Sequence, residues 1–218
     1  MSTAVGKGVI MSALKKRSYN AAGRQAEAQK TRERVLQIAQ QLFQSAGFEK
    51  VTIADIAGQA SVAVPTVYAL FQSKLGLLQA IIDAALPEKE REALVQECIT
   101  QGSSAAERLE NTARLTRRLY DAEQQQLSLL PAASLLDPAF KKLEQEREMR
   151  RYKRQADSVK ELVAKGAFAA GITPAMAQDI IWAFTGRDLY RMLVIERKWS
   201  ADEYEKWLAK LLIETLLK

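Results

Sequence analysis

The chain of 218 residues is 48% hydrophobic and carries a net charge of +6 without a single histidine. The missing imidazole excludes His-based general-base catalysis, a Ser-His-Asp triad and a His-ligated metal site. The single cysteine excludes an intrachain disulfide framework, and no apolar run approaches the ~18 residues that span a bilayer. We therefore expect a cytoplasmic protein that is not an enzyme, holds no cofactor or metal and has no membrane segment.

The positive charge lies near the N-terminus. Residues 1–34 hold eight of the 32 basic and two of the 26 acidic side chains, so this segment carries the whole excess and the remainder is neutral. A basic segment beside a neutral body is typical of an arm that follows a polyanion, because neutralising phosphates releases counterions. A solubilising tail explains the same composition equally well.

Helical periodicity runs through nearly the whole sequence. Apolar residues recur at three- and four-residue spacing, and only 10 glycines and 5 prolines interrupt them, which predicts an all-α fold. We predict a first helix that begins as early as Ala22 and ends at Ala46, before Gly47. Its apolar stripe consists of Val35, Ile38, Ala39, Leu42, Phe43 and Ala46.

Residues 52–71 are predicted to form two short helices joined by a tight turn. Thr52 fits an N-cap whose capping-box partner is Asp55, and this pair predicts a helix over 53–59. After the turn, Pro65 is well placed at the start of a third helix. Two helices in this arrangement form a helix-turn-helix, the motif with which many proteins bind DNA.

Further N-terminal caps mark the helices of the remaining chain. Ser73 predicts a fourth helix that ends before Pro87. Later starts are marked by capping boxes or by a cap before proline, at Ser104, Asp137-Pro138, Thr173-Pro174 and Ser200. These caps predict helices near 104–123, 138–165, 174–198 and 201–217, and we expect a shorter helix around 125–136. Apolar residues surround the helix at 174–198 on more than one face, so it needs burial partners in its own domain and in a second subunit.

The sequence from Thr31 to Leu86 resembles the TetR family of bacterial one-component transcriptional regulators. The residues in family register are Thr31-Arg32, Ala39, Phe43, Gly47, Thr52, Ile56-Ala57, Ala60, Val62, Thr66, Tyr68, Phe71, Lys74 and Leu77-Leu78. The resemblance implies a basic N-terminal arm at 1–21 and a small three-helix DNA-binding domain at 22–86, with its helix-turn-helix at about 52–71. It also implies a larger helical ligand-binding and dimerisation domain at 87–218.

The resemblance further implies which residues bind double-stranded DNA. Phosphates would be contacted by Thr52, Thr66, Tyr68 and Lys74, and base edges in the major groove by Ala63, Val64 and Pro65. Physical chemistry supports Thr52 and Lys74, because each lies at a helix N-terminus, where free N–H groups and the helix dipole favour an anion. The alternative for Tyr68 is a packed aromatic ring, and for Lys74 an ordinary solvated side chain.

Some positions depart from the commoner family pattern. Ser61 replaces a turn glycine, at a cost on the order of 1 kcal/mol if its φ is positive, and Leu70 replaces an aromatic residue. The reading face 63–65 carries no side-chain donor, so it lacks the bidentate base contacts that bring ~1–3 kcal/mol of discrimination. We therefore expect basic residues of the arm to supply affinity through phosphates or the minor groove, namely Lys15, Lys16, Arg17 and Arg24.

For the C-terminal half, the resemblance implies a homodimer and a small-molecule pocket. The last two helices of each subunit would form a four-helix bundle, which presents two reading heads to a palindromic operator. Plain core packing explains the candidate pocket residues as well as a cavity does: Leu115, Leu119, Tyr120, Leu129, Met149, Tyr152, Trp182 and Phe184. The charged stretch 141–154 is expected to be a solvated helix face rather than an anion site. No effector class follows from the sequence.

Taken together, these features predict a sequence-specific DNA-binding transcriptional regulator. We expect a repressor that an unidentified small-molecule effector releases from its operator, because ligand and DNA would share one conformational equilibrium. The competing interpretation is a helical ligand-binding or protein-interaction module that has lost DNA binding, and the donor-free reading face is compatible with it. An enzyme is the least supported class, since the sequence offers no catalytic constellation.

Overall fold

The computed structural model describes the backbone of residues 6–100, 104–127, 129 and 138–217, and the side chains of these residues except 6–22, 99, 100 and 139. The described residues are almost entirely helical, and an isolated β-bridge joins Phe168 to Leu217. The all-α prediction is therefore confirmed. In this part of the chain, no single helix is long and apolar enough to cross a membrane.

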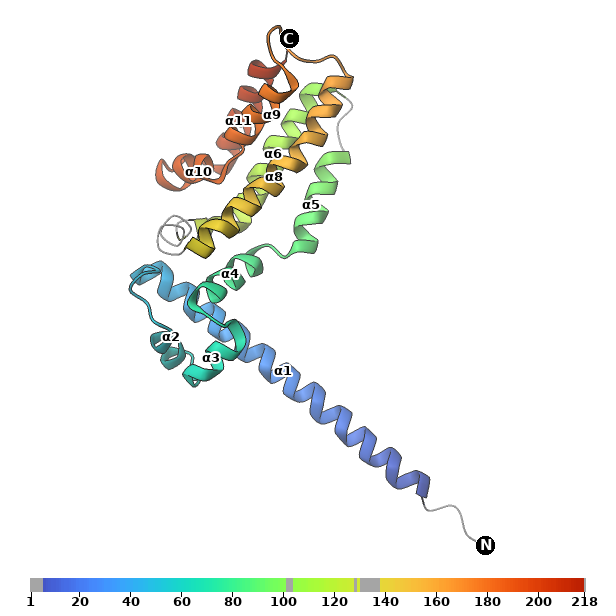
Figure 1. The fold of residues 1–218 in the computed structure, drawn as a ribbon, viewed down its shortest axis with the longest axis vertical. Helices are drawn as coiled ribbons and strands as arrows, with labels where there is room; N and C mark the ends of the chain where they lie inside the picture. Colours follow the sequence, from blue (N-terminus) through green and yellow to red (C-terminus); the bar gives the residue numbers. More distant parts are fainter. Residues whose placement is uncertain (1–5, 101–103, 128, 130–137, 218) are drawn as a thin grey trace.

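The N-terminal part of the fold consists of α1 (Gly6–Ala46), α2 (Ile53–Gln59), α3 (Val64–Phe71) and α4 (Lys74–Ala85). Figure 1 shows α2, α3 and α4 gathered at one end of α1, whose N-terminal half extends away from the rest of the molecule. The predicted start of α1 near Ala22 is wrong, because the helix begins at Gly6. The sequence upstream of Ala22 contains no proline and includes three alanines and three lysines, which are good helix formers, so helix propensity favours continuation.

The C-terminal end of α1 agrees with prediction, and so does its apolar stripe except at Ala46, which is exposed. Gly47 adopts the left-handed region at φ +87°, and its N–H donates to the carbonyl oxygen of Phe43 over 3.0 Å. Val35, Ala39 and Phe43 are fully buried. They belong to one core with apolar side chains of the next three helices, including Ile53, Ile56, Ala57, Val67, Phe71, Leu77 and Leu78.

The C-terminal part is a layered bundle that α4 joins to the N-terminal helices. Its helices are α5 (Glu88–Thr100), α6 (Ala105–Leu127), α8 (Pro138–Ala164), α9 (Pro174–Phe184), α10 (Arg187–Tyr190), the π-helical η1 (Arg191–Glu196) and α11 (Ala201–Leu216). α11 and α5 pack against α6, and α8 packs against α9 (Figure 1). Three buried tyrosines from three helices pack against one another with tilted or edge-to-face rings. The ring centroids lie 5.6 Å apart for Tyr120 and Tyr190 and 5.1 Å apart for Tyr190 and Tyr204.

Two segments near the middle of the chain differ from prediction. Helix α5 was not predicted, because its sequence is rich in charge and offers only a weak apolar stripe at Leu94, Val95 and Cys98. Helix α6 continues to Leu127, so the short helix predicted near 125–136 does not begin at residue 125. Most of that predicted helix, together with the Asp137 cap, lies outside the described residues.

The helix predicted at 174–198 is interrupted. Thr173 caps its start as predicted, by accepting from the backbone N–H of Met176 over 3.2 Å. The chain leaves the helix at Thr185 and Gly186 and then continues as α10 and η1. Gly186 is extended, at φ −74° and ψ +150°, and glycine is the weakest helix former after proline.

Candidate nucleic-acid interface and effector cavity

Helices α2 and α3 form the predicted helix-turn-helix. The chain direction bends by 109° between them, and the backbone N–H of Val62 donates to the carbonyl of Ala57 over 3.0 Å. Ala57 is buried, and its small side chain lets the two helices approach closely. Ser61 takes the turn in the left-handed region at φ +52°, a conformation that a residue with a β-carbon adopts at a cost. The position where the sequence replaces glycine with serine is therefore strained.

The capping box of α2 is present. The Thr52 hydroxyl oxygen accepts from the backbone N–H of Asp55 over 3.1 Å, and the Asp55 carboxylate accepts from the Thr52 backbone N–H over 2.8 Å. The hydroxyl also donates to this carboxylate over 2.6 Å, and these hydrogen bonds hold the pKa of Asp55 below its ordinary value. The Thr52 hydroxyl is thus already engaged, and a DNA phosphate would compete with Asp55 for its proton.

Helix α3 divides into a buried and an exposed face. Val67 and Phe71 are buried against the domain core. The predicted base-reading residues Ala63, Val64 and Pro65 are all exposed, and Thr66 is half-buried. The ring of Tyr68 is 49% exposed, so it is not a packed aromatic residue. The structure brings these residues together on one solvent-facing surface.

Lys74, the first residue of α4, is held beside this surface. Its ammonium group donates to the carbonyl oxygen of Glu49 over 3.2 Å and lies 4.4 Å from the centroid of the Phe48 ring. Partial burial lowers its pKa. Lys74 is therefore not an ordinary solvated lysine, and an ammonium group that spends one donor on Glu49 keeps others for an anion.

Two arginines of α1 contact the helix-turn-helix, although no role was predicted for either. The Arg34 Nε donates to the carbonyl oxygen of Ala60 over 3.0 Å at the end of α2, and the Arg32 guanidinium lies 5.2 Å from the centroid of the Phe71 ring. Among the predicted arm residues, Arg24 is exposed on α1. The side chains of Lys15, Lys16 and Arg17 lie outside the described residues.

The comparison with protein families falls on this part of the chain. Residues 35–81 match the family described as "Bacterial regulatory proteins, tetR family". The segment belongs to the TetR family. It contains the C-terminal end of α1, the whole helix-turn-helix and most of α4, so the TetR-family assignment rests on the same residues that form the exposed face. No curated protein matches the chain.

Solved structures extend the likeness to the whole fold. A regulator from Saccharomonospora viridis, solved in complex with choline, has a TM-score of 0.64 at 19% identity, covering 87% of this chain and 99% of its own. The ketosteroid transcriptional regulator KstR2 of Mycobacterium tuberculosis has a TM-score of 0.60 at 16% identity, covering 86% and 95%. A TetR/AcrR-family regulator from Thermobifida fusca has a TM-score of 0.60 at 22% identity, covering 84% and 96%. At these identities the TetR-type fold, with its DNA-binding and helical C-terminal parts, is what the structures share.

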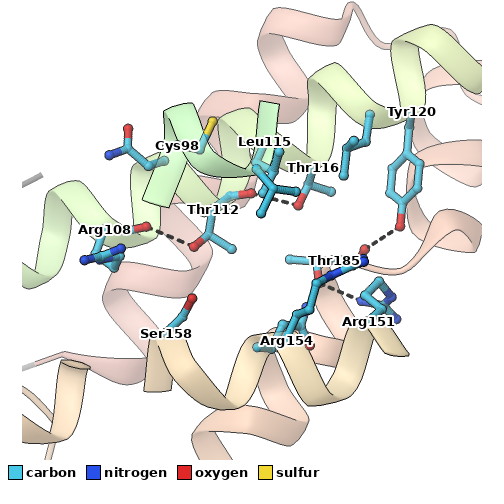
Figure 2. Close-up of a pocket in the computed structure, with 14 residues that line it drawn as sticks. Cys98, Arg108, Thr112, Leu115, Thr116, Tyr120, Arg151, Arg154, Ser158 and Thr185 are labelled. Carbon is cyan, nitrogen blue, oxygen red and sulfur yellow. Dashed lines mark hydrogen bonds between the residues drawn. The ribbon is translucent and has the colours of Figure 1, made fainter. Parts of the chain in front are cut away.

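The C-terminal bundle contains a cavity of about 90 Å³ between α5, α6 and α8. Figure 2 shows Thr112, Leu115 and Thr116 of α6 on one side of this space and Arg154 and Ser158 of α8 on the other. A second cavity of about 450 Å³ lies toward α4. The two cavities share four lining residues, Leu119, Tyr120, Arg151 and Arg154.

The predicted pocket residues divide between these cavities and other places. Leu115, Leu119 and Tyr120 line the first cavity. Trp182 and Phe184 line a separate groove of about 670 Å³ between α8, α9 and η1. The remaining three residues line none of these cavities. Leu129 is buried, Met149 is exposed, and the Tyr152 hydroxyl donates to the Asp179 carboxylate over 2.9 Å. The arginines of the cavities were missed, because the periodicity of α8 places them on a charged face.

Thr185, at the break after α9, joins three helices beside the first cavity. Its hydroxyl donates to the carbonyl of Ile181 over 2.6 Å and accepts from Arg151 and Gln155 of α8, each over 2.8 Å. Its carbonyl oxygen accepts from the Tyr120 hydroxyl over 2.8 Å, and burial raises the pKa of Tyr120 to about 12. The break in the predicted helix is therefore a connection between α6, α8 and α9.

A buried carboxylate lies behind the second cavity. Glu123 of α6 is 1% exposed, and its two oxygens lie 2.8 Å from Nη2 of Arg91 and 3.2 Å from Nη2 of Arg187. These contacts join α5, α6 and α10. Buried charges in proteins are generally paired in this way, since an unpaired one is costly.

The same network reaches the DNA-binding part of the fold. Arg187 also contacts Glu144 of α8 over 2.6 Å, and Glu144 contacts Arg147 over 3.1 Å. Arg147 in turn contacts Asp83 of α4 over 2.9 Å. An alternating series of charges thus links the C-terminal bundle to α4, which packs directly against α1 and α3.

Proposed function

We propose that the chain is a sequence-specific DNA-binding transcriptional regulator that responds to a small molecule, and that it is not an enzyme. The observation that carries the proposal is the TetR-family match at residues 35–81 over a folded helix-turn-helix whose α3 surface faces solvent. A regulator of this kind acts on DNA in the cytoplasm. Within the described residues, no group of three or more His, Cys, Asp and Glu side chains could hold a metal ion.

The exposed surface of α3 is the proposed DNA-reading element. Ala63, Val64 and Pro65 face base edges in the major groove, and their apolar side chains favour thymine methyl groups. Phosphates are bound by the polar residues around them, Thr52, Thr66, Tyr68 and Lys74. We assign residues 22–86 to the DNA-binding domain, 87–218 to the ligand-binding and dimerisation domain, and 1–21 to a basic arm that adds phosphate or minor-groove contacts.

We further propose a homodimer that binds a palindromic operator. Five large apolar side chains that are exposed in the single chain lie on α8, α9 and η1, namely Met149, Val163, Met176, Trp182 and Met192. Large apolar side chains exposed on neighbouring elements are compatible with a protein interface. A two-fold dimer through the last helices would present two copies of α3 to two half-sites.

The effector is proposed to bind in the C-terminal cavities and to release the operator. Ligand and DNA are linked through the equilibrium between spacings of the two reading heads, so a ligand that favours the wrong spacing weakens repression. Choline, which the S. viridis protein binds, is not carried over, because arginines line the second cavity of this chain. A cation would be repelled there.

DNA binding can be tested by footprinting and by fluorescence anisotropy on the intergenic DNA upstream of the coding sequence. The proposal expects a protected palindrome, and it expects Lys74→Gln to reduce the slope of log affinity against log salt by about one, as for one lost phosphate contact. Lys153→Gln is the matched control, because Lys153 is an exposed lysine of α8. Negligible, salt-insensitive binding would instead favour a module that has lost DNA binding.

The basic arm needs its own test. Deleting residues 1–21 is expected to lower operator affinity and to flatten its salt dependence, since the deleted segment carries Lys15, Lys16 and Arg17. Arg24 stays in the truncated protein, so Arg24→Gln in that background measures its separate contribution. Unchanged affinity together with an unchanged salt slope would refute the arm.

A further inference from the structure

The second cavity has an unusual lining. Six arginines border it, against three carboxylates: Arg91, Arg147, Arg150, Arg151, Arg154 and Arg187. They come from three helices that are far apart in the sequence, α5, α8 and α10. The stretch 141–154 is therefore not simply a solvated face, since the side chains of Arg147 and Arg151 are only 16% and 15% exposed.

Arg154 differs from its paired neighbours. Arg91, Arg147, Arg151 and Arg187 each contact at least one carboxylate. Within the described part of the chain, neither Arg150 nor Arg154 has a hydrogen bond or a carboxylate within 4.0 Å. Arg150 borders only the second cavity, whereas Arg154 lines both. Its guanidinium group presents five donors in a fixed fork, and the side chain lies where the two cavities meet.

The electrostatic surroundings of Arg154 favour an added negative charge. Partial burial lowers its pKa, and repulsion from Arg91, Arg150 and Arg151 lowers it further, against an opposing contribution from Glu88. Arg154 is nevertheless exposed and accessible to a ligand, and a cation surrounded by like charge is stabilised when an anion binds beside it. The lining thus lacks a counter-charge beside Arg154.

The first cavity supplies an apolar compartment next to these donors. Val95, Leu115 and Leu119 line it together with the hydroxyls of Thr112 and Thr116. Small-molecule sites commonly combine such an apolar wall with a few polar groups that fix orientation. The two adjoining cavities therefore match a molecule with one charged end and one apolar end.

We infer that the effector is an organic oxyanion, a carboxylate or a phosphate ester, whose charged group binds Arg154 and whose short apolar chain enters the cavity lined by Val95, Leu115 and Leu119. The inference rests on the proposed function, because it names the class of effector for the proposed site. Planar and tetrahedral oxyanions both accept the paired N–H groups of a guanidinium.

The position of the anion also gives it a way to act on α4. Arg147 lines the same cavity and contacts Asp83 of α4. A bound oxyanion competes with the Asp83 carboxylate for this guanidinium and so weakens the contact between α4 and α8. Because α4 packs against α3, this change reaches the DNA-reading surface.

The test is calorimetric titration of the full-length protein with four eight-carbon probes of different charge. These are octanoate, octyl phosphate, the neutral octanamide and the cationic octyltrimethylammonium. We expect at least one of the two anions to bind at least tenfold more tightly than the amide, and the cation not to bind. Arg154→Gln should weaken anion binding about tenfold or more, the loss expected for a charge-assisted hydrogen bond, whereas Arg154→Lys should retain part of it.

Controls separate this inference from misfolding and from the proposed function. Lys153→Gln removes an equal charge from the same helix and should leave anion binding unchanged, and each variant should unfold at the wild-type temperature. Equal binding of anions and amide, no binding of either anion below millimolar concentration, or unchanged binding by a folded Arg154→Gln would overturn the inference. Operator binding is measured on the same preparations. If the wild-type protein does not bind operator DNA, the proposed function is contradicted. If it binds DNA but neither anion, only the effector class is contradicted.

Discussion

Burial of Glu123 predicts that its charge contributes several kcal/mol to stability. The carboxylate contacts Arg91 and Arg187, whose side chains are only 17% and 16% exposed. Glu123→Gln keeps the shape of the side chain but removes the charge. It leaves two largely buried guanidinium groups short of a carboxylate, and such groups are poorly compensated by an amide.

The expected loss of stability depends on which carboxylates the two arginines still contact after the substitution. Breaking a buried ion pair costs about 3–5 kcal/mol when one partner is removed. Arg187 retains Glu144 at 2.6 Å and Arg91 retains Glu88 at 3.7 Å, so the lower end, about 3 kcal/mol, is expected. For a chain of this length each kcal/mol lowers the unfolding midpoint by roughly 2–4 °C, which gives a decrease of about 6–12 °C.

The measurement is thermal unfolding followed by circular dichroism, at one protein concentration because oligomers unfold in a concentration-dependent way. The matched control is Glu97→Gln. Glu97 contacts Arg118 over the same 2.8 Å, but the two side chains are 47% and 37% exposed, so at most about 1 kcal/mol is expected. If Glu123→Gln lowers the midpoint no more than Glu97→Gln does, burial does not determine the strength of these pairs and the reasoning is refuted.

Two further predictions concern backbone strain and pH. Ser61→Gly should raise the free energy of unfolding by about 1 kcal/mol in urea titrations, because glycine adopts φ +52° without strain; Ser61→Ala is the control that should give no gain. Burial raises the pKa of Tyr120 to about 12, above the value of 10.0 for an exposed tyrosine. The neutral side chain therefore stabilises the folded state fully below pH 10, and this contribution to the free energy of unfolding is lost as the pH rises toward 12. Tyr120→Phe should flatten that part of the stability profile in urea titrations between pH 9 and 12, and an unchanged slope would contradict the assignment.

Local chemistry made the helix starts predictable from the sequence. Each cap depends on residues three positions apart, and the predicted hydrogen bonds of Thr52, Ser73, Ser104 and Ser200 are all present. The break at Thr185 was not predictable in this way. Its hydrogen-bond partners on α6 and α8 lie between 30 and 65 residues away, so only the packed fold brings them together.

The DNA-reading surface and the effector cavity also differ in how far the sequence predicts them. The exposed face of α3 follows from a contiguous motif, so its residues could be named before the fold was known. The arginine-lined cavity depends on helices that meet only after folding, as the contacts of Arg91 with Glu123 and of Arg187 with Glu144 illustrate. The spacing of charges within 141–154 predicts i,i+4 pairs, whereas Arg147 pairs with Glu144 and Arg151 with Glu148, each at i,i+3. Spacing within α8 also does not reveal which of its arginines face a cavity.

Lys74 has a consequence for the entropy of DNA binding. A lysine side chain that becomes fixed loses up to about 2 kcal/mol of rotamer freedom. The Phe48 ring and the Glu49 carbonyl already confine this side chain in the folded protein, so most of that loss occurs on folding. Phosphate binding by Lys74 would then cost little further side-chain entropy. Phe48, a buried residue, would in this way strengthen operator binding without touching DNA.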